Sequence, residues 1–251
     1  MTDEDRQVAV LSEDAALRVI LEGTAAETGE DFFRALVRKL TEALGTHGAW
    51  VTEFDESNRR LRALAFWLGD RYVDEYEYAI AGTPCESVIE QACLVHYPER
   101  VIELFPDDPD LQAFGAVSYM GAPLQDLDGR VLGHLAVLDT SPMPRRDRVE
   151  TLFRIFAGRA AAEHRRLRAE AQIREREEKL GRLFAGAMDA IIEIDRELKV
   201  SLFNPAAGRL FGSHSHEVVG SGLGRFLDEA GCRALTRAMA KLDTADDDRQ
   251  Y

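Results

Sequence analysis

A proline-free stretch in the middle of the chain limits its fold more than any other feature. Between Arg145 and Phe184 there is no proline, and the only glycines are Gly158 and Gly181. Most of the other residues are Ala, Arg, Glu and Leu, which are strong helix formers. The stretch predicts one helix of about 35–40 residues that rises about 1.5 Å per residue. Because such a helix extends beyond a small domain packed against it, we expect separate folded regions before and after it.

Apolar residues recur along this stretch and predict a face that pairs two copies of the helix. They are Ile155, Ala162, Leu167, Ile173, Leu180 and Leu183, and they are interrupted by Arg166 and Glu170. Their spacing is typical of a weak heptad pattern, which favours a coiled coil. We therefore expect residues 145–182 to form a coiled-coil-like linker in a homodimer, either parallel or antiparallel. The expected contact residues are Ile155, Ala162, Ile173 and Leu180.

Charge is distributed unevenly along the chain. The whole sequence has 31 basic and 45 acidic residues, for a formal net charge of −14. Residues 1–144 contain 11 basic and 27 acidic side chains, whereas residues 145–182 contain 12 and 7. An acidic surface repels phosphate backbones, so we expect no nucleic-acid partner for this chain. The basic residues of the helix are interleaved with acidic ones, which fits a solvated helix surface better than a polyanion-binding patch.

The chain lacks the sequence signals of a membrane protein. Its longest apolar runs are far shorter than the roughly 18–20 residues that a membrane span needs. The N-terminus, Met1-Thr-Asp-Glu-Asp-Arg6, is acidic and lacks the basic-then-apolar order of a signal peptide. We therefore predict a cytoplasmic protein with no membrane span.

The first region alternates between helical and extended patterns. A helix is predicted over Ser12–Glu22, and a second one follows the capping sequence Thr28-Gly-Glu-Asp31 and ends at Gly45. Extended segments are predicted by runs of alternating or continuous apolar residues, and two of them are joined by a turn at Asp128-Gly129, which predicts a β-hairpin. The predicted strands are 49–54, 61–67, 76–78, 117–124 and 131–138, with short helices over 85–91 and 110–114.

The region after the long helix shows a shorter set of elements. Residues 190–194 and 200–203 are predicted to form a strand pair, and Asn204-Pro205 opens a helical segment that ends at Gly212. Residues 228–242 are predicted to be helical, and the acidic residues 244–248 are predicted to be a frayed end.

The first region resembles a GAF domain. The motifs that carry the resemblance are Gly82-Thr-Pro-Cys85, Phe105-Pro-Asp-Asp108, Gly115-Ala-Val-Ser-Tyr-Met-Gly-Ala-Pro-Leu124 and Asp128-Gly-Arg-Val-Leu-Gly133. They look most like the GAF domains of bacterial sensor kinases, cyclases and transcriptional activators. The resemblance implies an α+β fold in which helices flank an antiparallel sheet. The pattern Asn-Lys-Phe-Asp-Glu, which marks GAF domains that bind cyclic nucleotides, is missing.

The last region resembles the front part of a PAS domain. The matching motifs are Met188-Asp-Ala-Ile-Ile-Glu-Ile-Asp195, Asn204-Pro-Ala-Ala207, Leu210-Phe-Gly212 and Glu217-Val-Val-Gly220. Counterparts of the later PAS strands are missing, so the resemblance implies a partial PAS-like α/β domain. The predicted order is a GAF domain with its N-terminal helix at 1–144, a signalling helix at 145–182 and a truncated PAS domain at 183–251.

The GAF resemblance implies a ligand pocket between the sheet and the short helices of residues 85–114. The expected lining residues are mainly aromatic, and Tyr119 is the strongest candidate because its hydroxyl needs a polar partner when buried. The candidates are Trp50, Phe66, Cys85, Phe105, Tyr119, Gly121 and Pro123. Each of these residues taken singly fits the core better than a ligand contact, and neither the ligand nor any cofactor is identified by the sequence.

Cysteine chemistry is a further candidate function. The chain has three cysteines and no CxxC pair, which disfavours a disulfide framework and a zinc site. Cys85 is predicted to begin a helix, where the helix dipole favours a thiolate, so Cys85 and Cys93 are candidate redox residues. The alternative is that each is a plain buried cysteine. Cys93 is followed by Leu94, whereas a bilin-binding GAF domain has histidine directly after its cysteine, so a photoreceptor is disfavoured.

Other polar clusters lack the companions that catalysis needs. Asp107-Asp108 lies in a proline-flanked turn, where aspartate typically caps a helix. His214-Ser-His216 is spaced for a metal clip but fits a hydrophilic loop better. We therefore expect no metal site and no enzyme activity.

These features together predict a sensory input module of a bacterial signal-transduction protein, such as a two-component histidine kinase. The GAF and PAS domains would sense a small molecule or a redox change, and the dimeric helix would relay the signal to an output domain beyond Tyr251. The alternative is a scaffold in which the GAF domain binds no ligand and only mediates dimerisation or protein interaction.

Overall fold

The computed structural model describes Arg18, Thr24 and residues 26–247, with side chains as far as residue 238. The chain divides into two compact units, Met1–Ala169 and Glu170–Tyr251, and each is described by itself. Apart from Arg18, the predicted helix over Ser12–Glu22 lies outside the described residues. The predicted division at 144 and 182 stays a prediction.

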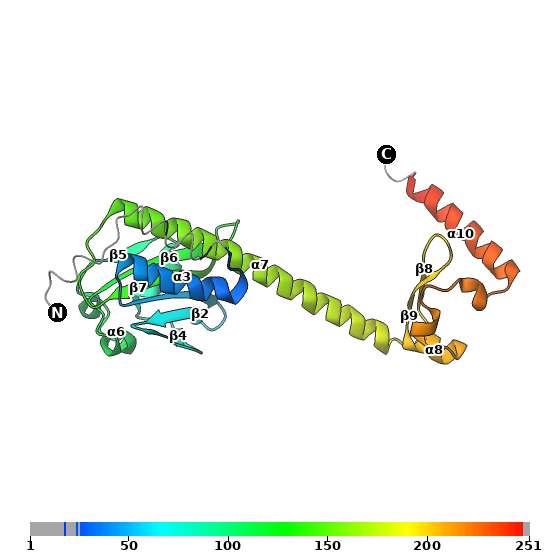
Figure 1. Ribbon diagram of the computed structural model, residues 1–251, viewed down its shortest axis with the longest axis horizontal. Coiled ribbons are helices and arrows are strands. Elements are labelled where there is room, and N and C mark those ends of the chain that lie inside the picture. The colour runs from blue at the N-terminus through cyan, green and yellow to red at the C-terminus, as the bar shows by residue number, and fades with distance from the viewer. Residues whose placement is uncertain (1–17, 19–23, 25, 248–251) are drawn as a thin grey trace. The chain divides into compact units, whose positions relative to one another are not determined.

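An antiparallel sheet of seven strands forms the centre of the first unit (Figure 1). The strand order is β3-β2-β1-β7-β6-β5, and β4 pairs with β2. The elements are β1 (Gly48–Asp55), β2 (Arg60–Leu68), β3 (Arg71–Tyr72), β4 (Glu77–Ala79), β5 (Val95–Tyr97), β6 (Ser118–Gln125) and β7 (Val131–Asp139). All five extended segments predicted for this unit are confirmed. The two-residue β3 and the three-residue β5 were not predicted.

Tight turns set the register of the two hairpins. Between β1 and β2, Asp55 Oδ1 accepts the backbone N–H of Ser57 at 3.0 Å, and Asp55 pairs with Arg60. Between β6 and β7, Gly129 has a φ of +87°, and its N–H donates to Asp126 O at 3.1 Å. Glycine is suited to this position because it adopts positive φ at little cost. The hairpin predicted around Asp128-Gly129 is therefore confirmed.

One face of the sheet is covered by α3 (Gly29–Leu44) and by the first part of α7 (Asp147–Gly186). The apolar residues of α3 recur at helical spacing and are buried against the sheet, and Gly45 ends the helix in the left-handed conformation. The predicted capping box at Thr28 is wrong, because the Thr28 side chain makes no capping hydrogen bond. Instead the Gly29 N–H donates to the Glu163 carboxylate of α7. A long-range contact therefore replaces the local cap.

The opposite face is covered by three short helices, α4 (Pro84–Gln91), α5 (Val101–Leu104) and α6 (Pro109–Ala113). Pro84 and Pro109 each begin a helix, where proline loses no hydrogen bond. Asp108 caps α6 by accepting the N–H groups of Asp110 at 3.0 Å and Leu111 at 3.3 Å. The capping role predicted for this aspartate is confirmed.

The long helix α7 runs for 40 residues, as the proline-free stretch predicts. Its buried residues all lie in its first half and pack in the same core as α3: Phe153, Phe156, Ala157, Ala160, Ala161 and His164. Of the predicted apolar stripe, Leu167 packs against this core, whereas the four expected dimer contacts do not. Ile155, Ala162, Ile173 and Leu180 are all exposed, so packing inside the first unit leaves the predicted dimer face uncovered.

The second unit contains a two-stranded sheet of β8 (Ile192–Ile194) and β9 (Val200–Phe203), which confirms the predicted strand pair. Asn204 is fully buried: its amide nitrogen donates to Asp189 O at 2.9 Å, and its Oδ1 accepts the Ala207 N–H at 2.8 Å. This cap opens α8 (Pro205–Phe211), as predicted. The remaining elements are α9 (Ser215–Val218), a 3-10 helix (Leu223–Arg225) and α10 (Glu229–Asp247).

The helix predicted over 228–242 is longer than expected, because α10 continues to Asp247. Among the residues with a described placement, no helix has both the length and the apolar character that crossing a bilayer requires.

Candidate functional site

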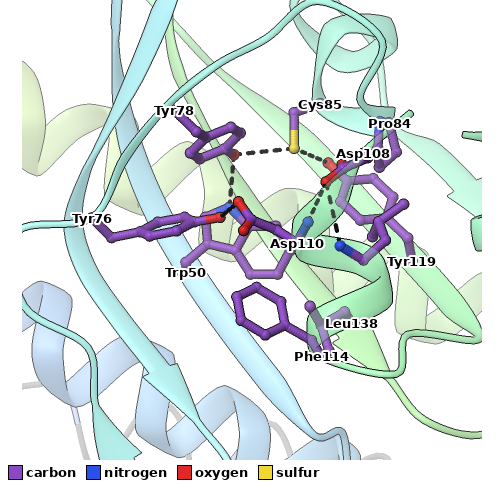
Figure 2. A pocket seen from close by; sticks show the side chains of 11 residues that line it. Trp50, Tyr76, Tyr78, Pro84, Cys85, Asp108, Asp110, Phe114, Tyr119 and Leu138 are labelled. Atoms are coloured by element: carbon purple, nitrogen blue, oxygen red, sulfur yellow. Dashed lines mark hydrogen bonds between the residues drawn. The ribbon is translucent and has the colours of Figure 1, made fainter. Parts of the chain in front are cut away.

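A cavity lies between the sheet and the helices α4 and α6 (Figure 2). Its volume is about 20 Å³, which is room for one water-sized group. Five of its eleven lining residues are aromatic, two are acidic and none is basic. The lining consists of Trp50, Tyr76, Tyr78, Pro84, Cys85, Asp108, Asp110, Leu111, Phe114, Tyr119 and Leu138.

A chain of hydrogen bonds joins four of these residues from four different elements (Figure 2). The indole N–H of Trp50 donates to the Tyr78 hydroxyl at 3.1 Å, and that hydroxyl donates to Cys85 Sγ at 3.1 Å. The Tyr119 hydroxyl donates to the same sulfur at 3.5 Å. The polar partner expected for buried Tyr119 is therefore Cys85. Because each side chain is held by a neighbour, the inner wall of the cavity is preorganised.

The outer wall carries two carboxylates and a phenol. Asp110 accepts a hydrogen bond from the Tyr76 hydroxyl, and Asp108 is only 7% exposed. Burial and the charge of Asp110 raise the pKa of Asp108, which its hydrogen bonds from Asp110 N–H and Leu111 N–H offset in part. Burial and the Asp110 carboxylate together raise the pKa of Tyr76 far above its ordinary value, so Tyr76 is a neutral donor.

The structure corrects the expected thiolate at Cys85. Cys85 is the second residue of α4, but it is buried, and this burial raises the pKa of its thiol to about 11. Desolvation disfavours the charged form more strongly than the start of a short helix favours it. Cys85 is therefore a neutral thiol at physiological pH. Cys93 is exposed and Cys232 is partly exposed, and all three cysteines are free.

The structure brings some of the predicted pocket residues together and separates others. Trp50, Cys85 and Tyr119 line the cavity. Phe66 and Phe105 lie in the apolar core around it, and Phe66 contacts Trp50 with 5.5 Å between the ring centroids. Gly121 lies against the Tyr119 side chain. Pro123 pairs with His134 in the β6–β7 register and does not line the cavity.

Sequence reasoning missed five polar or aromatic lining residues: Tyr76, Tyr78, Asp108, Asp110 and Phe114. Tyr76 and Tyr78 are two positions apart in an extended segment, so their side chains lie on the same face. That spacing was the available signal. Asp110 and Phe114 carried no such signal in the sequence, because only the fold brings α6 next to β4.

The buried histidines lie outside the cavity lining. His134 Nδ1 is 2.6 Å from Thr52 Oγ1, and burial lowers the pKa of His134 to about 3. His164 of α7 has Nε2 3.8 Å from Glu53 Oε2, and burial lowers its pKa too. His214 and His216 stack on each other with 5.7 Å between ring centroids. In the described part of the chain, no three His, Cys, Asp or Glu residues are grouped to hold a metal.

The first unit therefore combines an antiparallel sheet, helices on both faces and a small cavity on one side. The family profile described as "GAF domain" matches residues 28–163, more than half of the chain. The chain therefore belongs to the GAF domain family, whose members commonly act in sensing and signalling. No curated protein matches it.

Solved structures with the same fold support this assignment. The GAF domain of a phosphoenolpyruvate-protein phosphotransferase (ptsP) from Coxiella burnetii has a TM-score of 0.54 and 19% identity, with 64% of this chain and 96% of that chain covered. The corresponding domain from Acinetobacter has a TM-score of 0.53 and 16% identity, with coverage of 64% and 99%. The chromophore-binding domain of RpBphP3, a bacteriophytochrome from R. palustris, has a TM-score of 0.50 and 11% identity, with coverage of 68% and 64%. At these identities the likeness concerns the fold alone.

Proposed function

We propose that this chain is a non-catalytic sensory input module in which the cavity binds a small molecule and α7 carries the response. The observation that carries the proposal is that α7 is part of the GAF core in its first half and exposed in its second half. A change in the packing of the core is thereby converted into a movement of a helix that continues out of the core.

The cavity and α7 lie on opposite faces of the sheet and are separated by a single layer of strands. Successive side chains in a strand point to opposite faces. Trp50, Tyr119 and Leu138 line the cavity, and their neighbours belong to the core on the α7 side: Val51, Met120 and Val137. A displacement of β1, β6 or β7 therefore changes the side-chain packing on both faces of the sheet.

Polar contacts along the first half of α7 attach it to the domain. His96 of β5 lies 3.3 Å from Glu150 through its Nδ1, and Arg159 donates to Thr24 O at 2.6 Å. Arg165 donates to Gln125 O, at the end of β6, at 2.7 Å. Two of these contacts reach the neighbouring strands β5 and β6, so they attach α7 to this side of the sheet.

The exposed half of α7 supports the dimeric relay. Ile173 and Leu180 are 56% and 66% exposed, and Leu183 is 63% exposed. Large apolar side chains seven residues apart on an exposed helix favour pairing with a second helix. The unit that follows carries the motifs that resemble a PAS domain, and we propose that it receives the signal as a second sensory module. The same exposed side chains also favour the alternative, a ligand-free dimerisation scaffold.

A non-catalytic role fits the chemistry of the cavity. Its one nucleophile, Cys85, is held as a neutral thiol by burial, and its hydrogen-bonding partners are two tyrosines whose own pKa values burial raises well above their ordinary values. None of the lining residues is a histidine or lysine that could act as a base near neutral pH.

A metabolite screen followed by hydrogen–deuterium exchange tests the proposal. We expect at least one compound that raises the melting temperature of the full chain, has no such effect on Trp50→Phe, and changes exchange in residues 147–186. Leu127→Ala is the matched control, because Leu127 is 89% exposed in the β6–β7 turn and should not alter binding. Compounds that bind in the cavity and leave exchange in α7 unchanged would contradict the relay, and a screen in which no compound binds would favour the ligand-free scaffold.

A further inference from the structure

The walls of the cavity carry negative charge without a compensating cation. Asp108 and Asp110 accept hydrogen bonds only from uncharged donors, namely the backbone N–H groups of Asp110 and Leu111 and the hydroxyl of Tyr76. Within the described residues, neither carboxylate is in an ion pair, and no basic side chain lines the cavity. A buried carboxylate is costly unless a positive charge neutralises it.

The rest of the lining also favours a positive charge. Trp50, Tyr76, Tyr78, Phe114 and Tyr119 surround the carboxylates with aromatic rings, whose faces are electronegative and attract ammonium groups. Trp50 and Tyr119 have their ring centroids 5.9 Å apart, and Tyr76 and Tyr78 have theirs 5.0 Å apart. Figure 2 shows Asp110 beside Tyr76 and near Trp50, so the carboxylate and the rings face the same space.

The size of the cavity selects among cations. A volume of about 20 Å³ accommodates a water-sized group such as a primary ammonium, and a quaternary ammonium with its methyl groups is larger. Tyr76, Asp110 and Phe114 are only partly buried, so they form the rim, whereas Cys85 and Tyr119 are fully buried. A hydrocarbon chain attached to the ammonium can therefore leave past the rings of Tyr76 and Phe114.

Other ligand classes fit less well. An anion would face two carboxylates with no positive side chain in the lining. A neutral apolar molecule would contact the rings but leave the carboxylates uncompensated. A divalent metal needs six or so oxygen ligands, and the lining offers only two carboxylates.

We propose that the cavity binds the ammonium group of a small primary amine, with Asp110 and Asp108 as the counter-charge and the five aromatic side chains as its walls. This inference rests on the proposed sensory function, since it names the class of molecule that is sensed. The acidic surroundings, 27 acidic against 11 basic residues in 1–144, favour the approach of a cation.

Trp50 fluorescence provides the test. The chain has two tryptophans, and Trp67 packs against the other core, on the α3 side, so Trp67→Phe leaves Trp50 as the single reporter in the full chain. This protein is titrated with butylammonium chloride, butanol and sodium butyrate at matched ionic strength. We expect a saturable change in Trp50 emission with butylammonium alone.

Three substitutions in the same background locate the charge that is recognised. Asp110→Asn, which can still accept from Tyr76, should weaken butylammonium binding at least tenfold. Asp107→Asn removes the same charge three residues away at an exposed position outside the lining and should leave binding within twofold. Asp108→Asn keeps a good helix cap and gives a second variant if Asp110→Asn fails to fold; it should also weaken binding.

The outcomes separate this inference from the proposed function. Equal fluorescence responses to butanol and butylammonium, or equal losses of butylammonium affinity in Asp110→Asn and Asp107→Asn, overturn the amine assignment. Neither result contradicts the proposal that the chain is a ligand-binding sensor. A response to butyrate alone, or no response to any of the three, also overturns it. Butylammonium binding without a change in hydrogen–deuterium exchange of residues 147–186 supports the amine and counts against the relay.

Discussion

The hydroxyl oxygen of Tyr78 lies 3.1 Å from the sulfur of Cys85. Tyr78 comes from the edge strand β4 and Cys85 from the first turn of α4, so this one contact joins the rim of the sheet to the helix that covers it. Since Trp50 donates to the same hydroxyl, the three side chains move together. The cysteine thereby acts as a structural acceptor within the cavity wall.

The reactivity of the cysteines follows from their burial. At pH 7.5 we expect iodoacetamide to modify Cys93, which is exposed, and to leave Cys85 unmodified, because the pKa of Cys85 is about 11 and only the thiolate reacts. Peptide mass mapping of the native and urea-unfolded chain measures this. Cys85 should react in urea, and modification of native Cys85 as fast as Cys93 would contradict the assigned burial.

Gly121 is the position where the cavity wall tolerates no added atom. A Cβ at this residue would lie 2.8 Å from Val88 Cγ2 and would also collide with the Tyr119 hydroxyl. We expect Gly121→Ala to lower the free energy of unfolding by about 1–3 kcal/mol through overpacking. Urea unfolding followed by circular dichroism measures the change.

Gly158 provides the matched control for that substitution. It lies in α7 with nothing within 4 Å of an added Cβ. Gly158→Ala should raise stability by about 0.5–1 kcal/mol, because alanine loses less backbone entropy in a helix. Equal effects of the two alanine substitutions would show that space around Tyr119 is not limiting.

His134 makes the stability of the first unit dependent on pH. Burial lowers its pKa to about 3 from an ordinary value of 6.5, so the folded state holds it neutral while the unfolded chain takes up a proton. Stability from this group is complete above pH 6.5 and is lost as the pH falls towards 3. Between pH 7 and pH 5 the loss is about 2 kcal/mol.

His134→Leu isolates this contribution. Leucine removes the titrating ring together with its buried Nε2, which has no hydrogen-bond partner among the described residues. The backbone N–H of residue 134 remains, and its 3.2 Å hydrogen bond to Thr52 Oγ1 is kept. Urea unfolding at pH 7 and pH 5 should show a smaller loss for the variant than for the unchanged chain. An identical loss in both proteins would mean that His134 titrates normally.

The exposed half of α7 should control oligomeric state. We expect the full chain to be a dimer by light scattering, and Ile173→Glu with Leu180→Glu to shift it towards monomer, because charges in a helix seam oppose pairing. Leu127→Glu is the control, since Leu127 is equally apolar and exposed but lies in the β6–β7 turn. A monomeric unchanged chain at high concentration would rule out the dimeric relay.

Local pattern was sufficient to predict the longer helices and strands of this protein among the described residues, while β3, β5, α5 and α9 were missed. The proline-free stretch predicted α7 to within two residues at each end, and the two apolar runs joined by a turn at Asp128-Gly129 predicted the β6–β7 hairpin. The motifs around Phe105 and Gly115 indicated the GAF fold, which the family match confirms. Such patterns are readable because burial on one face imposes a period on neighbouring residues.

The failures have a common cause in long-range contact. The cap of α3 comes from Glu163, which is 134 residues away from Gly29 in the chain. The thiol of Cys85 is neutral because strands and helices distant in sequence bury it, and no local motif reports that burial. The buried side of α7 is chosen by contact with α3 and the sheet, and of the predicted stripe only Leu167 packs there.

The sequence by itself determined that this protein has a long helix between two folded regions, a GAF-type sheet and a set of aromatic candidates near Tyr119. Only the tertiary structure decided which residues enclose the cavity, because Tyr76 and Tyr78, Asp108 and Asp110, and Trp50 come from three separate stretches of chain. The charge of a site depends on which side chains are brought within a few ångströms of one another and shielded from water. The charge of the site is therefore set by which strands and helices pack together and by burial, and neither produces a periodic pattern along the sequence.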